Sequence, residues 1–337
     1  MRIPLYALLV LSVNVYAQNP PEAEISNGTI HAKIYLPDAK IGFYRGTRFD
    51  WSGVVNSLKF KGHDYYGPWF TKTAPDVHDF VYAGPEIVAG PCSAITGPVE
   101  EFSTNGKALG YQEAKAGGTF LKIGIGVLRK PDQADYDNYR LYEIVDPGKW
   151  TIHKKADSIE FIQEVLDPLS GYGYRYTKTV SLVAGKPGML IEHRLKNIGR
   201  RSIESDVYDH NFLVLDKQPT GPNFEIRLPF DFSAKEAIAP KMAEKRGHAF
   251  VYRKLLQDKD TVAVTFQGYG ATPADYNITI DNRKVGVGMN ISCDRPLAHL
   301  SLWSIRSVLA MEPYVKMSID PGQDFTWTYT YSYYGLP

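Results

Sequence analysis

The chain has 337 residues, of which 44% are hydrophobic, so it is long enough to bury a large core. Its formal net charge is only +1, with 22% charged residues, and this balance argues against nucleic acid or an anionic membrane as a partner. Aromatic residues make up 13% of the chain and include 23 tyrosines, which suits β-sheet packing and also the stacking of sugar rings.

The first 17 residues have the order of a signal peptide. Arg2 provides a positive start, the apolar run PLYALLVLSV follows, and VYA stands before Gln18. The run is too short to span a bilayer comfortably, and small residues at this place are typical of a cleavage site. We expect residues 1–17 to be removed and the mature chain, 18–337, to be periplasmic or secreted. The alternative is a buried N-terminal strand.

Residues 65–118 are rich in Gly, Pro and aromatic residues and contain GPWFTKTAPDVHDF and AGPEIVAGPCSAITGPVEEF. This composition predicts long loops over one face of a sheet, and such loops in a compact domain are usually functional or mobile. Cys92 lies in this region, and Cys293 is the only other cysteine. In an oxidising compartment the two could form a disulfide; alternatively, both are small buried apolar residues.

The second half of the chain alternates with a period of two. The clearest run is FTWTYTYSYY at 325–334, with an aromatic residue at every second position and Thr or Ser between them. Similar alternation predicts strands at 189–197, 260–266, 276–281 and 284–292, separated by Gly, Pro, Asn and Asp. Helical periodicity is scarce, and Pro240 breaks its best candidate, 234–247. With no linker and no internal repeat, the pattern predicts one large antiparallel sandwich.

Two titratable residues stand in settings that suit acid–base chemistry. His210 lies in SDVYDHNFLVLD, at 205–216, where Tyr208 and Phe212 flank it on the same face of a predicted strand. Glu312 follows an apolar run and precedes Pro313. A histidine on an aromatic-lined face suits a general acid, and a carboxylate in this setting suits a general base. The alternative is structural: a satisfied core histidine and a strand-end acid in an ion pair.

The sequence contains no CxxC, HExxH, EF-hand or GxSxG pattern. The chain therefore carries no strong metal signal and no support for a serine hydrolase. We expect no cofactor, and a Ca²⁺ ion in the fold or in the site stays an open alternative.

Four segments between about residue 40 and residue 335 resemble, in the same order, the galactose mutarotase (aldose 1-epimerase) superfamily. They are FDWSGVVNSLKFKGHDY (49–65), KTVSLVAGKPGMLIEHRLKNIGRRSI (178–203), YDHNFLVLD (208–216) and LAHLSLWSIRSVLAMEPYVKMSIDPGQDFTWTYTYSY (297–333). The last match is the most specific, and the resemblance is to a divergent branch of the superfamily.

The resemblance implies a single β-supersandwich over 18–337 and a reaction that interconverts the anomers of an aldose. In that reaction a glutamate takes the proton from the C1 hydroxyl while a histidine protonates the ring oxygen; the ring opens, the C1 carbonyl turns, and the reverse step closes the ring. His210 matches the position of the acid and Glu312 that of the base. By analogy with acid–base groups that flank a sugar ring, we expect their side-chain tips about 5–8 Å apart.

The chain departs from the superfamily pattern upstream, where typical members carry a second histidine and an Asn-Arg pair. Thr96 stands at the nearest match for that histidine. We expect Arg48 to replace the missing pair, although a surface hairpin charge is the alternative, and Glu100 or Glu101 to take over sugar contact. His78 is a further candidate, with an exposed loop histidine as the alternative. The remaining residues expected to bind substrate are Asp50, Asp209, Trp303 and Tyr314.

We therefore interpret the chain as an exported, aldose 1-epimerase-like isomerase that acts on a mono- or oligosaccharide. We expect a monomer or dimer with no nucleic-acid partner and no membrane association once the signal peptide is removed. Two alternatives stand beside this interpretation: a non-catalytic carbohydrate-binding protein, and a lyase or epimerase that uses the same cleft on a modified or acidic sugar. The fold alone does not choose between them.

Overall fold

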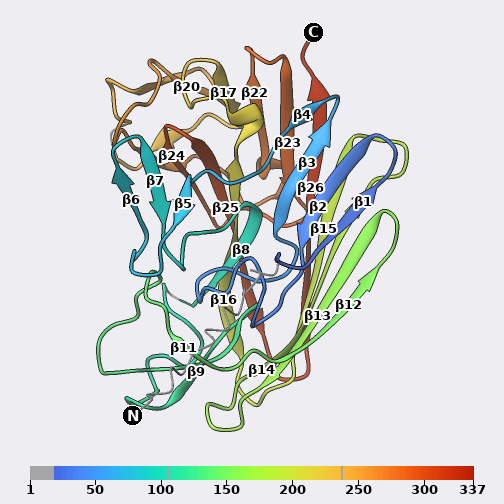
Figure 1. The fold of residues 1–337 in the computed structure, drawn as a ribbon, viewed down its shortest axis with the longest axis vertical. Coiled ribbons are helices and arrows are strands. Elements are labelled where there is room, and N and C mark those ends of the chain that lie inside the picture. The colour runs from blue at the N-terminus through green and yellow to red at the C-terminus, as the bar shows by residue number, and fades with distance from the viewer. Residues whose placement is uncertain (1–18, 105, 237) are drawn as a thin grey trace, which may run out of the picture.

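A computed structural model describes residues 19–104, 106–236 and 238–337 (Figure 1). Its regular structure is β apart from two short 3-10 turns, η1 (Leu215–Lys217) and η2 (Pro273–Asp275). The prediction of a largely antiparallel, all-β fold is therefore confirmed. No helix among these residues has the length and apolar character to cross a membrane. The predicted signal peptide, 1–17, lies outside the described residues.

The larger sheet has ten strands and contains four of the five segments that the alternation predicted. Its strands, in spatial order, are β12 (Lys149–Lys154), β13 (Ser158–Leu166), β14 (Gly173–Leu182), β15 (Gly188–Asn197), β26 (Asp324–Gly335), β23 (Val287–Cys293), β22 (Asn277–Asn282), β17 (Phe224–Arg227), β20 (Ala249–Tyr252) and β19 (Ala243–Arg246). In Figure 1 the long strands β13, β15 and β26 run along one side of the molecule.

The second sheet has six strands and carries both halves of the predicted acid–base pair. In spatial order the strands are β18 (Ser233–Ala234), β21 (Val262–Gln267), β24 (His299–Ile305), β25 (Val308–Ile319), β16 (Ile203–Leu213) and β8 (Gly97–Ser103). All the pairings between neighbouring strands of this sheet are antiparallel.

Three smaller sheets complete the described structure. The four-stranded sheet consists of β1 (Glu22–Ser26), β2 (Ile30–Tyr35), β3 (Val55–Phe60) and β4 (His63–Asp64). The two three-stranded sheets consist of β11 (Glu143–Asp146), β10 (Gly126–Arg129) and β9 (Thr119–Lys122), and of β5 (Lys72–Thr73), β7 (Glu86–Ala89) and β6 (Phe80–Ala83). The parallel pair β5–β7 is an exception to the antiparallel rule.

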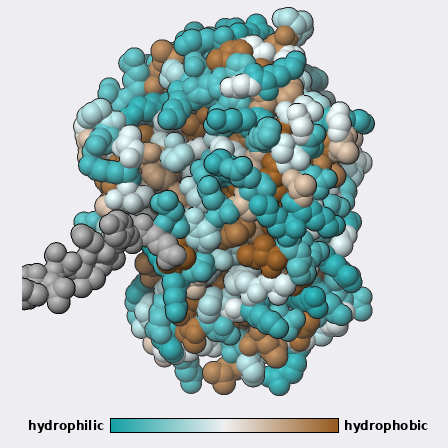
Figure 2. Space-filling view, turned by 45° about the vertical axis from the view of Figure 1, so that its right-hand side comes forward, coloured by the Kyte–Doolittle hydropathy of each residue, from teal (hydrophilic) through white to brown (hydrophobic). Residues whose placement is uncertain are grey.

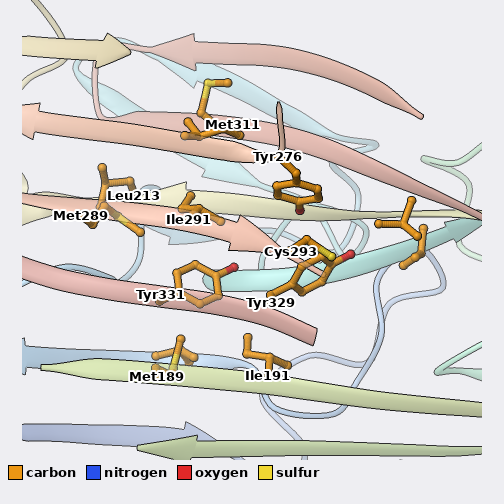
Figure 3. Close-up of a cluster of buried hydrophobic side chains, with 14 of the residues drawn as sticks. Met189, Ile191, Leu213, Tyr276, Met289, Ile291, Cys293, Met311, Tyr329 and Tyr331 are labelled. Atoms are coloured by element: carbon orange, nitrogen blue, oxygen red, sulfur yellow. The ribbon is translucent and has the colours of Figure 1, made fainter. Parts of the chain in front are cut away.

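The main hydrophobic core includes side chains from both large sheets. The aromatic residues at alternate positions of β26 are buried in it: Trp327, Tyr329, Tyr331 and Tyr333. Figure 3 shows two of these tyrosines beside side chains of β15 and β23, and near Leu213 of β16 and Met311 of β25. The alternation thus separates a buried face from a wetter one on each strand. The surface seen in Figure 2 is mostly hydrophilic, with hydrophobic residues in small separate patches.

One expectation about local structure needs correction, and two questions that the sequence left open are decided. Residues 65–118 are not only loops, because they contain β5 to β8, and β8 pairs with β16 in the six-stranded sheet. The adjacent acids Glu100 and Glu101 interrupt the apolar pattern of β8, which is why it did not look like a core strand. The weak helix candidate, 234–247, contains the end of β18 and the whole of β19. Cys92 and Cys293 are both buried and free, so they form no disulfide with each other.

Candidate active site

A cleft with a volume of about 920 Å³ lies on the face of the six-stranded sheet that points away from the main core. Side chains at every second position of a strand share a face. On β16 this rule sends Tyr208, His210 and Phe212 into the cleft, and on β25 it sends Glu312 and Tyr314 there. One face of the sheet therefore holds the aromatic residues and the titratable residues together.

The structure brings His210 and Glu312 into direct contact. The Nε2 atom of His210 lies 3.2 Å from the Oε1 atom of Glu312. This distance is shorter than the expected range of about 5–8 Å, and the register explains the difference. β16 and β25 are antiparallel neighbours, and the pairs Tyr208–Tyr314 and Asn211–Met311 place His210 directly across from Glu312. Side chains of directly opposed residues start with Cβ atoms only about 5 Å apart.

Glu312 sits in an environment that favours its neutral form. Its side chain is only 15% exposed, and the hydroxyl of Ser301, its cross-strand neighbour on β24, donates a hydrogen bond of 2.9 Å to Oε2. Burial raises the pKa of Glu312 to about 7, although the hydrogen bond from Ser301 and the charge of Arg48 work in the opposite direction. A carboxyl group with this pKa can give up or take a proton near neutral pH.

His210 is enclosed by aromatic rings. Its ring stacks on Phe212 with a centroid distance of 3.7 Å and meets Phe49 edge-on at 5.7 Å. Burial, together with the nearby charge of Arg48, holds the pKa of His210 well below its usual value. The buried Nδ1 atom has no hydrogen-bond partner within the described part of the chain. The imidazole is therefore neutral at pH 7 in the free protein.

A second polar group in the cleft consists of Arg48, Glu101 and Tyr208. Arg48 donates two hydrogen bonds: from Nε to Oε2 of Glu101 at 2.7 Å, and from Nη2 to the hydroxyl of Tyr208 at 3.0 Å. The Tyr208 hydroxyl in turn donates to Oε2 of Glu101 at 2.5 Å. The other carboxylate oxygen of Glu101, Oε1, accepts a hydrogen bond of 3.2 Å from the buried Nζ of Lys122. Burial opposes the ionisation of Glu101, but Arg48 and Lys122 outweigh it and lower its pKa. These bonds hold Arg48, whose side chain is only 12% exposed, at the wall of the cleft.

Four of the predicted substrate-binding residues line the cleft and three do not. Those that line it are Arg48, Glu101, Trp303 and Tyr314. His78 is an exposed loop residue, with a side chain 63% exposed and its Nε2 atom 3.0 Å from Asp137. The expectations for Asp50 and Asp209 are also corrected, because both are fully buried and belong to a network behind the sheet.

A buried network lies on the opposite face of β8 and β16 from the cleft and was not predicted from the sequence. Glu100 is bonded by the ammonium of Lys178 and by Nε2 of His193, the latter at 2.7 Å. Lys178 also lies 3.5 Å from Asp50 and donates to the carbonyl of Ser52 at 2.8 Å. Lys178 and His193 hold the pKa of Glu100 at about 2 although burial works against its ionisation. Ion pairs this deep must be well paired, because burying a lone charge is costly.

Asp209 joins the same buried layer. It accepts a hydrogen bond from the hydroxyl of Tyr331, which is also bonded to Oδ1 of Asn211 at 2.8 Å. Burial, with the nearby charge of Glu100, raises the pKa of Asp209 to about 8. Asp209 and Asn211 point inward because they alternate along β16 with His210, which faces the cleft.

Similar folds occur among solved structures, although no protein-family model matches the chain and no curated protein sequence does either. A galactose mutarotase-like protein from Lactobacillus casei is 13% identical, with 93% of this chain and 100% of that chain covered and a TM-score of 0.54. An aldose epimerase homologue from C. elegans is also 13% identical, with 94% and 100% covered and a TM-score of 0.54.

The chain has the galactose mutarotase-like fold. The resemblance recognised in the four sequence segments is thus confirmed at the level of the fold. At identities this low the likeness says nothing about individual side chains, so the roles of the cleft residues have to be argued from their own geometry.

Within this galactose mutarotase-like fold, sequence reasoning overlooked Ser301 and Tyr139. Ser301 is recognisable only from the pairing of β24 with β25. Tyr139 comes from a loop and covers the guanidinium of Arg48 at 4.7 Å from its ring centroid. Thr96, the nearest sequence match for the missing second histidine, is buried and donates to the carbonyl of Val55 at 3.0 Å, so it does not reach the cleft. Among the described residues, no three His, Cys, Asp or Glu side chains gather as they would around a metal ion.

Proposed function

We propose that the protein interconverts the anomers of an aldose by acid–base catalysis, with His210 and Glu312 as the catalytic residues. The observation that carries this proposal is the contact of 3.2 Å between the two groups inside a cleft. Anomerisation needs one proton donor and one acceptor that reach the C1 hydroxyl and the ring oxygen, which are bonded to the same carbon. Two groups this close together can reach both oxygens from one side of a pyranose.

The electrostatics suit a pair that holds one proton. Burial raises the pKa of Glu312 to about 7 and lowers that of His210, so in the free protein the proton resides on Glu312 rather than on His210. Ring opening moves a proton from the acid to the ring oxygen and another from the C1 hydroxyl to the base. The pair thus ends with its proton on the other member, and ring closure returns it. From this resting state Glu312 is the initial acid and His210 the initial base, which reverses the roles that the resemblance implies.

The charges around the cleft favour a neutral sugar over an acidic one. The lining contains two basic residues, Arg48 and Lys316, and four acidic ones besides the protonated Glu312: Asp79, Glu101, Asp206 and Glu236. A uronic acid would meet a net negative field, which costs binding energy. This argues for a neutral aldose and against the lyase alternative, in which an acidic sugar is the substrate.

Anomer exchange in the presence of the protein tests the proposal directly. Exchange NMR on glucose, galactose, mannose, xylose and arabinose, beside a binding titration with each sugar, should show exchange above the spontaneous rate for at least one of them. Saturable binding without added exchange would replace the proposal with a carbohydrate-binding protein. An unsaturated product from a uronic-acid polymer would replace it with a lyase.

The pH dependence of kcat/KM should distinguish a pair that shares one proton from a lone carboxylate base. For the pair, kcat/KM falls as pH rises through about 7, because Glu312 loses the shared proton, and falls again in acid, where His210 gains a second one. A lone carboxylate base would show the opposite sign, with kcat/KM rising through pH 7. The measurement is the pH profile of catalysed exchange after subtraction of the spontaneous rate; a rise through pH 7 contradicts the one-proton mechanism.

We further propose that the mature protein is exported and begins near Gln18. The support is the order of the first 17 residues: a positive start, an apolar run and small residues before the cleavage point. N-terminal sequencing of the protein recovered from the extracytoplasmic fraction should read from Gln18. A cytoplasmic protein that retains Met1 would overturn this proposal.

A further inference from the structure

The cleft extends along the strands well beyond the catalytic pair. Lys316 lies four residues after Glu312 on β25, and Asp206 lies four residues before His210 on β16, so both share the cleft face with the pair. At about 3.3 Å per residue, they stand about 13 Å from the pair along the strands. A single sugar ring bound over His210 and Glu312 does not reach that far.

The polar groups at this far end have unused hydrogen-bonding capacity. Asp206 and Lys316 face each other in register, yet no ion pair within 4.0 Å joins them. Across the described ranges, the side chains of Asp206, Lys316 and His299 make no hydrogen bond to another protein group, although all three line the cleft. Asp206 is half-buried, and burial raises its pKa. A half-buried carboxylate without a protein partner is costly unless a ligand or water satisfies it.

An aromatic surface connects the far end to the catalytic pair. Tyr314 lies midway between Glu312 and Lys316 on β25, lines the cleft and is partly exposed. Its ring stacks on Tyr208 with a centroid distance of 4.5 Å and meets the ring of His299 edge-on at 4.9 Å. A fixed ring of this kind offers an apolar face for a sugar, and its polar neighbours can orient the hydroxyl groups.

We propose that the far end of the cleft, formed by Asp206, Lys316, His299 and Tyr314, binds the second sugar of a reducing disaccharide or longer oligosaccharide. The inference rests on the proposed function, which places the reducing ring with its free anomeric carbon over His210 and Glu312. A hydroxyl group both donates and accepts hydrogen bonds, so it can satisfy the carboxylate and the ammonium at once. A phosphate group would suit Lys316 but would be repelled by Asp206 and by Glu236, which also lines this end.

The test compares disaccharides with monosaccharides on the full chain. Calorimetric titrations with maltose, cellobiose, lactose, laminaribiose and melibiose, set against glucose and galactose, should show at least one disaccharide that binds about tenfold more tightly than its monosaccharide. Asp206→Asn removes the charged acceptor and should reduce that preference about tenfold, the scale of one hydrogen bond to a charged group. Lys316→Gln, at an exposed position that tolerates substitution, should reduce it as well.

Glu204→Gln is the matched control for Asp206→Asn. Glu204 is exposed on the same face of β16, two residues beyond Asp206, and does not line the cleft. An equal loss of preference in Asp206→Asn and Glu204→Gln would overturn the second-sugar site. The second-sugar site would also be overturned if the protein exchanged the anomers of glucose or galactose but bound none of the five disaccharides more tightly than its monosaccharide. In that case the proposed function stands. Tight, Asp206-dependent disaccharide binding without any anomer exchange would keep the second-sugar site and reject the proposed function.

Discussion

Replacing Glu312 with glutamine is expected to slow catalysed anomer exchange by about 100-fold or more while sugar affinity stays nearly the same. Glutamine keeps the shape of the side chain and can still accept the hydrogen bond from Ser301, but it cannot give up or take a proton at neutral pH. The loss should therefore appear in kcat rather than in binding, because the proton transfer occurs only in the transition state. Exchange NMR at saturating sugar, beside a titration, measures both quantities.

His210→Asn should lower the rate to a similar extent, and the double variant should be little slower than either single one. Two groups that pass one proton between them act as a unit, so removing the second costs little once the first is gone. His210→Asn should also weaken binding, because it removes a ring that stacks on Phe212. The matched control for Glu312→Gln is Glu192→Gln, at an exposed position of β15 outside the cleft, and this control should leave anomer exchange intact. Exchange at the parent rate in Glu312→Gln would refute the catalytic assignment.

The sequence was sufficient to place His210 and Glu312 on cleft-facing positions but not to give the distance between them. Alternation decides which face a side chain takes, and the register decides what stands across from it. Register depends on how strands far apart in the chain pair, and the pairing of β16 with β25 joins residues about 100 positions apart. Ser301 enters the site through the next pairing, of β24 with β25, and no local pattern marks it.

The errors at Asp50 and Asp209 have a different origin. Asp209 is adjacent to His210 within a strand, so the two had to face opposite sides of the sheet, and the same rule separates Glu100 from Glu101. The alternation of the strand therefore already indicated that Asp209 faces away from the cleft. The prediction placed the acids in the cleft because Asp and Glu are rarely fully buried in a core. The fully buried Lys178 and His193, whose partners are distant in sequence, make the buried acids possible.

The buried network ties both large sheets to the site. Lys178 on β14 and His193 on β15 belong to the ten-stranded sheet, whereas Glu100 belongs to β8 of the six-stranded sheet. Glu100 is followed directly by Glu101, which holds Arg48 in the cleft. The ion pairs behind the sheet therefore fix the position of the strand that carries part of the cleft wall, and their loss should be felt in stability first and in sugar binding second.

Lys178→Met is accordingly expected to lower the free energy of unfolding by about 3–5 kcal/mol, the usual cost of breaking a buried ion pair from one side. Methionine has a similar length and fills the space, so the loss comes from leaving Glu100 and Asp50 without their common cation rather than from a cavity. Lys196→Met, at an exposed position of β15, is the matched control and should stay within about 0.5 kcal/mol of the parent in chemical denaturation.

The double variant Lys178→Met with Glu100→Gln separates a charge effect from a packing effect. If the uncompensated carboxylate causes the loss, neutralising Glu100 should recover part of the free energy of unfolding, because the two residues are in direct contact and their effects are not additive. If the loss were one of packing, neutralising Glu100 would recover none of it, and the weaker hydrogen bond of a neutral glutamine with His193 would add to the loss. A Lys178→Met variant as stable as the parent would show that the ion pairs of Lys178 add no net stability, so that the sheets are joined by their apolar contacts and by the hydrogen bonds of His193 and Tyr331.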